Sequence, residues 1–542
     1  MNKKLKYGII VVIIAIIAIV AISSYFGTSH DDDPTHLVVT VPGHAGEPES
    51  GFNPLTGWGC GHLNFNPLVQ STLLKSDSNG SFVGDLAKNY TVSSDGLQWT
   101  VDIRNDVKFS DNSSLKASDV AFTFNTAKTS NSQLDISNLD KATAVNDTTV
   151  IFKLKKPQSS FVYNLRYIGI VPEKNYNNET YGANPIGSGP YKLKQWDKGQ
   201  QAIFVVNDNY YGQKPYFKQI TMLFPDEDTA FELVKSNQAD VVQAPFSSLN
   251  QSADGYKLVD MPSSRAQGIS LPYMNDTGLK TNNGHKVGNN VTADPAIRKA
   301  LNIGLNRSKI INSVYKGHGK VEYTGVDYLP YANDQAKVND SNTNEAKEIL
   351  ETAGWKDTDG DGIREKNGTK ASFTLYYASK DQSRQSLATV VSEQAKDLGI
   401  EIKLNGTDWD TIYQNMYSNA VVMQQSSDDP YRNIYQQYYS KNNFSEDDYM
   451  NPNEYNNSAV DNVLDQALSS NNQNQANAYW KQAAYIDSNS GFGPAANAPW
   501  LWIADYDYCY FVKNTVNIGK EPTMGQDYME NICNWTRNNK TS

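Results

Sequence analysis

An uninterrupted run of apolar residues stands near the start of the chain, from Gly8 to Phe26. Roughly 19 residues at ~1.5 Å per residue give a helix of ~28 Å, close to the thickness of the hydrocarbon layer of a membrane. Three lysines precede the run and three aspartates follow it. Because positive charge favours the cytoplasmic side, we predict a cytoplasmic tail at 1–7, a single-pass transmembrane anchor at 8–26 and a tether at 27–36.

A secretory signal peptide is the alternative interpretation of the same run. The run is long for a signal peptide, and its one small-x-small cleavage candidate is Ala21-Ile22-Ser23. No cysteine lies near its end, so a lipid anchor on cysteine is not available. Both alternatives place the rest of the chain outside the membrane, as an extracellular or periplasmic body.

Beyond the tether, the apolar positions alternate between the periods of strands and helices. In the first half they predict strands at 37–41, 99–103, 149–154 and 239–243, and helices at 118–124 and 228–235. The helix at 118–124 is expected to begin at a cap formed by Ser118.

The second half continues the alternation. Pro295 opens a predicted helix that runs to Ile310, and Gly354 stops another that begins at Asn344. A strand at 372–377, a helix at 382–398 and a strand at 400–404 follow. Strand, helix and strand at this spacing predict a pair of parallel strands. Without a short repeat or a long linker, the pattern favours two α/β lobes around a cleft.

Composition narrows the function classes. A chain of 542 residues is long enough for two or three lobes, and its net charge of -11 argues against binding nucleic acid. The 33 tyrosines and 9 tryptophans suit binding surfaces as well as cores. Three cysteines make no disulfide framework, although Cys509 and Cys533 are close enough in sequence to pair, which would leave Cys60 alone.

Asn-x-Ser/Thr sequons recur along the chain. In an external protein they are candidate glycan acceptors, and in an Asn-rich chain they also arise by chance. Examples lie at Asn89, Asn112, Asn146, Asn178, Asn290, Asn367 and Asn405.

The sequence lacks the common signatures of enzymes. It contains no His-Glu-x-x-His, no Gly-x-Ser-x-Gly and no Gly-x-x-x-x-Gly-Lys-Ser/Thr motif. Carboxylates are too frequent to single out an acid/base pair. A binding protein that needs no cofactor therefore explains the composition better than an enzyme does.

One loop is similar to a calcium-binding loop. Asp357, Asp359 and Asp361 alternate and are followed by Gly362, as in the first half of an EF-hand loop. Gly368 stands where the bidentate Glu is required. The two interpretations are a structural calcium site and an Asp/Gly-rich hairpin turn.

Ten short segments occur in the order found in one family. Because of these segments, taken together, the chain resembles the peptide/nickel class of extracellular solute-binding proteins, the receptors of ABC importers, over about residues 37–515. The segments are 84–90, 95–101, 103–104, 107–111, 117–124, 169–172, 184–192, 209–212, 294–301 and 353–362.

The resemblance implies a two-lobed periplasmic-binding-protein-like α/β fold built from three parts. Lobe I is expected at about 37–75, 185–270 and 498–542, subdomain II at about 76–184, and lobe III at about 271–497. Ligand closes the lobes of such proteins, and the closed form docks on permease subunits whose partner ATPases supply energy. We expect this receptor to be a monomer.

The resemblance also nominates residues that hold ligand. Arg166 falls where relatives carry an arginine facing the cleft, and Arg265 is a second candidate for binding a carboxylate. Trp58 and Gly59 lie in a loop that meets ligand in the family. In lobe III the candidates are Trp409, Asp428, Asp429, Tyr431 and Arg432.

Cys60 and His62 are two residues apart and offer soft ligands to Ni²⁺, Cu or Zn²⁺. The alternative is a small apolar Cys beside a solvated His. Nickel-binding relatives carry a His after the Asp-Pro pair, where this chain has Tyr431 and Arg432, and this departure weakens the nickel interpretation. We therefore expect a peptide receptor, with a nickel-chelate receptor as the alternative, and a sensor or an extracellular hydrolase as weaker ones.

Overall fold

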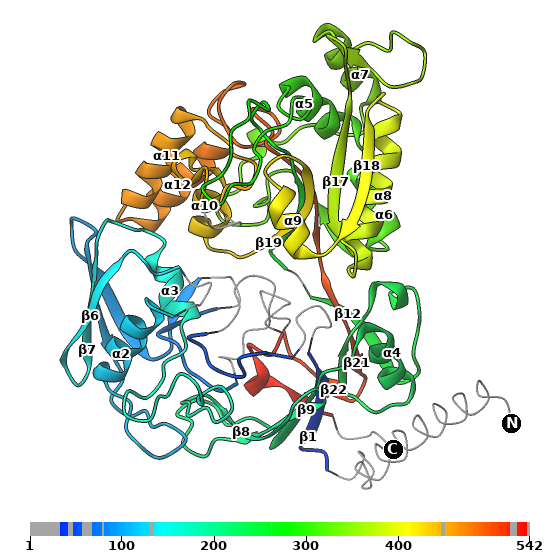
Figure 1. The fold of residues 1–542 in the computed structure, drawn as a ribbon. Helices are drawn as coiled ribbons and strands as arrows, with labels where there is room; N and C mark the ends of the chain where they lie inside the picture. Colours follow the sequence, from blue (N-terminus) through cyan, green and yellow to red (C-terminus); the bar gives the residue numbers. More distant parts are fainter. Residues whose placement is uncertain are drawn as a thin grey trace, which may run out of the picture.

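Three separate β-sheets organise the molecule, a computed structural model (Figure 1). The structure describes residues 33–41, 47–56, 68–77, 81–130, 135–261, 263–445, 450–520 and 528–538. The predicted anchor at 8–26 lies outside these residues, as do Trp58, Gly59, Cys60 and His62. Within the described part of the chain, no helix combines the length and the apolar character needed to cross a membrane.

Lobe I is built on a seven-stranded sheet in the order β12-β21-β11-β1-β10-β9-β8. Its central strand β1 pairs in parallel with β10 and β11, and its other ladders are antiparallel. Helix α4 (Glu227–Lys235) precedes β11. The strands are β1 (His36–Thr40), β8 (Tyr191–Asp197), β9 (Gln201–Val206), β10 (Gln219–Leu223), β11 (Val241–Gln243), β12 (Tyr256–Met261) and β21 (Tyr508–Lys513).

Subdomain II has a four-stranded antiparallel sheet in the order β4-β5-β7-β6. Helix α2 (Ala117–Ala127) packs on β6 and β7, and α3 (Phe161–Tyr167) follows β7. The predicted Ser118 cap is wrong: the Asp119 carboxylate accepts the Lys116 N–H at 2.8 Å, so the helix begins one residue earlier. The strands are β4 (Ala87–Val92), β5 (Gln98–Ile103), β6 (Leu139–Asn146) and β7 (Thr149–Leu154), beside the hairpin β2 (Leu74–Ser76) and β3 (Phe82–Gly84).

Lobe III has a six-stranded sheet in the order β14-β20-β13-β19-β17-β18. The predicted parallel pair is confirmed, because β17 and β18 are parallel and helix α8 (Gln382–Lys396) connects them. The predicted helix 295–310 is two helices, since the chain turns extended at Leu305 and Asn306 caps the second one. The strands are β13 (Arg265–Ser270), β14 (Gly319–Val321), β17 (Ser372–Ala378), β18 (Glu401–Thr407), β19 (Ala420–Ser426) and β20 (Trp500–Tyr506).

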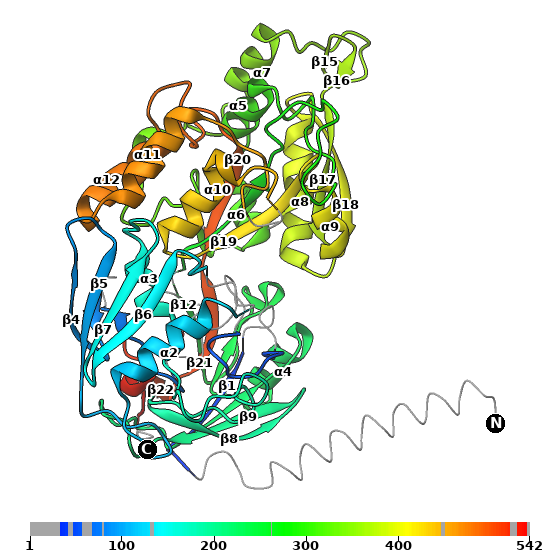
Figure 2. The same ribbon diagram turned by 60° about the vertical axis from the view of Figure 1, so that its left-hand side comes forward.

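Helices cover the lobe III sheet, and further helices lie to one side of it (Figure 2). Most of them begin at an Asp or Asn whose side chain accepts a backbone N–H of the first turn. They are α5 (Pro295–Gly304), α6 (Arg307–Val314), α7 (Thr343–Thr352), α8 (Gln382–Lys396), α9 (Trp409–Asn415), α10 (Gln436–Tyr438), α11 (Ser458–Ser469) and α12 (Gln473–Ala484). Two small hairpins complete the fold, β15 (Glu365–Lys366) with β16 (Thr369–Lys370) and β22 (Val516–Asn517) with β23 (Thr536–Arg537).

Two strand crossings join lobe I to lobe III. The chain passes from β12 to β13 between 261 and 265, and returns from β20 to β21 between 506 and 508. The predicted boundaries at 270 and 498 therefore need correction, because β13 and β20 hydrogen-bond within the lobe III sheet. Ser263 ties the crossings together, since its hydroxyl donates to the Tyr506 carbonyl at 2.8 Å.

The two cysteines near the end of the chain do not pair. Cys509 is a buried free thiol on β21, and Cys533 is a partly buried free thiol near β23. The suggested disulfide is therefore wrong, and each thiol packs in its own surroundings.

The turn at 187–189 shows why glycine is required in one of the segments that carry the family resemblance. A Cβ on Gly187 would lie 1.8 Å from the Val69 carbonyl oxygen, and a Cβ on Gly189 would lie 2.6 Å from the Leu68 carbonyl oxygen. The Gly189 N–H donates to the Val69 carbonyl at 2.9 Å. The two glycines thus allow the backbone of segment 68–69 to lie directly against this turn.

Replacing Gly187 with Ala should lower the free energy of unfolding by about 1–3 kcal/mol, because the methyl group must push two backbones apart. Urea unfolding measures the change. Ser188→Ala is the matched control in the same turn: the Ser188 hydroxyl is buried without a hydrogen-bond partner, so its loss should be close to neutral. Equal stability of Gly187→Ala and the wild type would contradict this packing.

Candidate functional site

A buried ion pair joins subdomain II to lobe III. Arg166 lies in the last turn of α3, and Asp428 lies in the segment that follows β19. Arg166 Nη1 is 2.7 Å from Asp428 Oδ2, and Nη2 donates to Oδ1 at 2.9 Å. The two side chains are only 9% and 18% exposed. This is the two-pronged geometry in which a guanidinium binds a carboxylate most strongly.

Neighbouring groups hold the Arg166 guanidinium in place. Its Nη1 donates to the Ser76 hydroxyl at 2.6 Å, its Nη2 donates to the Tyr167 hydroxyl at 2.7 Å, and its plane lies 4.5 Å from the centre of the Tyr167 ring. The Tyr167 hydroxyl in turn donates to Asp428. Burial raises the pKa of Tyr167 well above its usual value, against the lowering effect of Arg166, so this phenol stays a donor at neutral pH.

Asp429 adds a second, more deeply buried carboxyl group beside the pair. It is 3% exposed and accepts the Tyr431 N–H at 2.9 Å. Burial raises the pKa of Asp429 to about 7, although the Arg432 charge opposes this shift. A carboxyl group with this pKa can be neutral or charged near neutral pH, and a cation placed next to it would favour the charged form.

A π-helical turn, Tyr431–Tyr435, follows these aspartates and bridges the lobes a second time. The Tyr431 hydroxyl donates to Asp135 of subdomain II at 3.1 Å, and its ring stacks on Tyr435 with ring centres 5.3 Å apart. The Arg432 guanidinium lies 6.0 Å from the centre of the Tyr167 ring. Such turns are frequent at functional sites because they re-aim side chains out of a regular helix.

The structure therefore brings together five of the residues expected at the site, Arg166, Asp428, Asp429, Tyr431 and Arg432. Trp409 on α9 is part of a different group, stacked on Tyr413 and under the Arg384 guanidinium at 4.9 Å. Its role as a ligand platform stays a prediction.

Arg265 has a position that favours a structural role. It is buried at the start of β13, where its guanidinium donates to Gln424 at 2.8 Å and to the Tyr508 hydroxyl at 2.6 Å. These contacts hold β13 to β21 across the strand crossing. We did not expect this from the sequence, because the partner at position 508 is 243 residues away.

Several residues of the site carried no signal in the sequence. The Tyr331 hydroxyl donates to the Asp428 carbonyl at 3.0 Å. Glu530, from the C-terminal segment, lies near Arg166. Burial raises the pKa of Glu530, although the charge of Arg166 opposes this shift. Tyr167 could have been proposed because it directly follows Arg166. Glu530 could not, because only the fold brings residue 530 next to residue 166.

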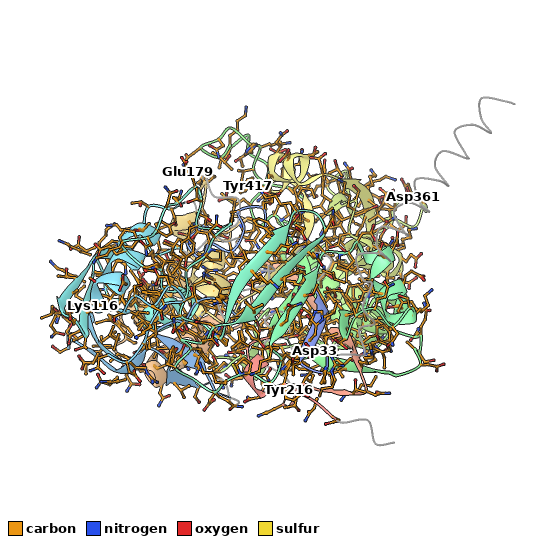
Figure 3. The ribbon with its side chains drawn as sticks, turned by 90° about the horizontal axis from the view of Figure 1, so that it is seen from below. Asp33, Lys116, Glu179, Tyr216, Asp361 and Tyr417 are labelled. Atoms are coloured by element: carbon orange, nitrogen blue, oxygen red, sulfur yellow. The ribbon has the colours of Figure 1, made fainter. Side chains whose placement is uncertain are left out.

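The acidic loop near 360 favours the hairpin interpretation. Lys370 forms ion pairs with Asp359 and Asp361, and both Asp357 oxygens accept backbone N–H groups of the turn. The loop is solvent-exposed, and Figure 3 shows Asp361 at the outer edge of the molecule. Calcium would have to displace the lysine from these carboxylates.

Two α/β lobes joined by two crossing strands, with a charged cluster where they meet, define a two-lobed ligand-binding protein. A profile of the family described as "Bacterial extracellular solute-binding proteins, family 5 Middle" matches residues 81–459. The chain belongs to this family, whose members are peptide- and nickel-class receptors of ABC importers. It is therefore a binding protein and not an enzyme.

Curated relatives of known ligand class are similar over most of the chain. The oligopeptide-binding protein AppA of Bacillus subtilis (strain 168) is 31% identical over 396 residues, which cover 69% of this chain and 70% of that protein. The nickel-binding periplasmic protein of Escherichia coli (strain K12) is 30% identical over 366 residues, which cover 64% of this chain and 67% of that protein.

Solved structures agree on the fold. AppA from Bacillus subtilis, in complex with a nonapeptide, has a TM-score of 0.71 at 25% identity and covers 93% of this chain and 99% of that chain. NikZ from Campylobacter jejuni, in complex with Ni(L-His), has a TM-score of 0.76 at 23% identity and covers 93% of this chain and 100% of that chain.

The raised pKa of Asp429 predicts how stability depends on pH. An unfolded Asp titrates near pH 3.8 and folded Asp429 near pH 7, so the folded state holds the proton more tightly and loses stability as pH rises between these values. Asp429→Asn removes this contribution. Between pH 4 and pH 7.5 the variant's free energy of unfolding should therefore decline by roughly 2–4 kcal/mol less than that of the wild type. Urea unfolding at both pH values measures it.

Asp254→Asn, at an exposed turn of lobe I, is the control and should leave the pH dependence unchanged. If Asp429→Asn shows the same decline as the wild type, Asp429 is not the buried carboxyl group described above.

Proposed function

We propose that this chain captures short peptides with free ends between subdomain II and lobe III, and delivers them to an ABC permease. The observation that carries the proposal is the Arg166–Asp428 pair, which places one buried charge of each sign at the junction of the lobes. A peptide with free ends carries the same two charges. Relatives named for oligopeptide binding support this ligand class.

The ion pair explains why a zwitterion suits the site. A ligand carboxylate that binds Arg166 displaces Asp428, and the freed aspartate then needs a cation. The ammonium group of the same ligand supplies it, so one buried pair is exchanged for two and no charge is left alone. A ligand with only one charged end would leave Arg166 or Asp428 uncompensated, at a cost of several kcal/mol.

Buried tyrosines suit the rest of a peptide. The hydroxyl groups of Tyr167, Tyr331 and Tyr431 all point at acidic or carbonyl oxygens of the cluster. They combine flat apolar surface with a polar end, and so can pack against varied side chains. Main-chain hydrogen bonds of an extended peptide would then supply affinity without selecting a sequence.

Peptides with blocked ends test the exchange. A tripeptide with free ends should bind, whereas its N-acetyl or C-amide form should lose about 2–4 kcal/mol of binding free energy, as expected when one member of a buried charge pair is left alone. Isothermal titration calorimetry measures the difference. In Arg166→Gln, the free peptide and its C-amide should bind with equal, weak affinity.

Arg104→Gln is the matched control, because Arg104 is also an arginine of subdomain II but forms a more exposed pair with Asp106. It should keep the preference for free ends. Strong binding of blocked peptides by the wild type would contradict the zwitterion requirement, and unchanged affinity in Arg166→Gln would remove Arg166 from the site.

A nickel chelate is the second candidate ligand, favoured by the relative named for nickel binding. The carboxylate of a small chelate such as nickel with histidine would bind Arg166 in the same way. Cys60 and His62 belong to this proposal as further ligands to the metal, and Trp58 and Gly59 as residues of the same loop that contact the bound ligand. A melting-temperature increase that requires both nickel and histidine would favour it over peptides.

We also propose that the apolar segment at 8–26 is retained as a single-pass anchor and that the receptor is a monomer. The seven sequon asparagines named above are all exposed, so glycans could be attached to each of them. The full chain should remain in the membrane fraction after alkaline extraction, since about 19 apolar residues span the hydrocarbon layer. A soluble protein whose N-terminus lies just beyond Ser23 would show that the segment is instead a cleaved signal peptide.

A further inference from the structure

Three side chains of different chemistry meet at the strand crossing that connects the lobes. Asp260 on β12 and Cys509 on β21 are directly opposite each other in the antiparallel ladder of lobe I. His318 comes from the turn that leads into β14, in the sheet of lobe III. The cluster therefore spans both lobes, and it lies apart from the Arg166–Asp428 pair.

The possible ligand atoms of these side chains are already close together. His318 Nδ1 is 2.9 Å from both carboxylate oxygens of Asp260, and Nδ1, the Cys509 sulfur and a carboxylate oxygen all lie within 4.8 Å of one another. Ligand atoms around a tetrahedral Zn²⁺ are about 3–4 Å apart, as its bond lengths of ~2.0–2.3 Å require. Small side-chain rotations would close the remaining gap.

We infer that Asp260, His318 and Cys509 form a site for a divalent transition-metal ion of the Zn²⁺ type at the hinge between the lobes. A thiolate, an imidazole and a carboxylate are the ligand types that Zn²⁺ takes in proteins. Water fills the fourth position, because the Asp260 side chain is 46% exposed and leaves an access path.

Binding at this site releases protons. The Cys509 thiol is buried, and burial together with Asp260 raises its pKa in the metal-free protein, so it is a neutral thiol there. A bound metal ion takes up the thiolate and the proton leaves to solvent. The imidazole must also give up any proton on Nδ1, where it now faces the Asp260 carboxylate.

The charges around the cluster favour a cation. Asp507, two residues before Cys509, adds a second, half-buried carboxyl group on this part of the chain. Among the described residues, Asp260 forms its ion pair with His318. A divalent cation would offset the negative charge of these carboxyl groups.

Such a site would restrict the hinge. Two ligands, Asp260 and Cys509, are fixed to the lobe I sheet. The third, His318, directly precedes β14 of the lobe III sheet. Metal–ligand bonds tolerate changes of only a few tenths of an ångström. An occupied site therefore holds the two lobes at one angle, whereas the metal-free hinge is crossed by weaker contacts, among them the hydrogen bonds of Ser263 and Arg265 and that of His318 with Asp260.

Titration of the full chain with Co²⁺ alone tests the site. One equivalent should produce the thiolate-to-cobalt charge-transfer band in the near ultraviolet, and Zn²⁺ should abolish the band by displacement. Cys509→Ser should lose the band, and His318→Gln should weaken Co²⁺ binding at least tenfold. Cys533→Ser and Cys60→Ser are matched controls and should keep it.

The opposite results overturn the inference. A band that persists in Cys509→Ser, or one that disappears in Cys60→Ser, places the metal on another thiol, and the absence of a stoichiometric band in the wild type shows that no thiolate site forms. If Cys509→Ser does not fold, Asp260→Asn and His318→Gln decide, since both side chains reach solvent. Because peptide binding is not the readout, failure here leaves the proposed function untouched.

Discussion

Two buried charges on different lobes constrain how this molecule closes. The Arg166 guanidinium and the Asp428 carboxylate are largely removed from water, and each would be costly to bury alone. Their attraction offsets that cost only where the flat guanidinium meets both carboxylate oxygens. The lobes therefore meet in one register, and the tyrosines and the second aspartate around the pair are arranged by it.

In the proposed function, the same constraint sets the specificity of the site. A closed site that already satisfies its own charges does not attract neutral solutes, because they would separate the pair without replacing it. A solute that carries both charges can replace the pair on both sides. The proposed selectivity for charge pattern, with tolerance for side-chain shape, rests on one ion pair surrounded by aromatic rings.

The hinge adds a second place where the lobes are coupled. In the part of the chain that the structure describes, two crossings connect the sheets of lobes I and III, and Ser263 and Arg265 hydrogen-bond across them. Rotation about so few connections leaves the cores of both lobes unchanged. The cluster of Asp260, His318 and Cys509 lies at these crossings, so a metal bound there would act on the hinge without touching the ligand.

Local patterns in the sequence were sufficient for much of the architecture. Apolar periodicity located most strands and helices, and the strand-helix-strand spacing at 372–404 predicted a parallel pair, since these features depend on neighbours along the chain. It missed one local contact, since Asp119 caps α2 at Lys116 and the helix begins at Ala117. It also failed where a distant contact decides, because β13 and β20 join the lobe III sheet although they lie outside its predicted range.

Arg166, Asp428 and Asp429 were predicted as site residues from their family segments. Their mutual pairing was not, because residues 166 and 428 are 262 positions apart and only the folded lobes bring them together. The hinge cluster of Asp260, His318 and Cys509 has the same origin. The sequence by itself determined which charged and ligating groups the chain carries and the elements that hold them. Only the tertiary structure decided which of them meet, because long-range pairing depends on how whole sheets pack.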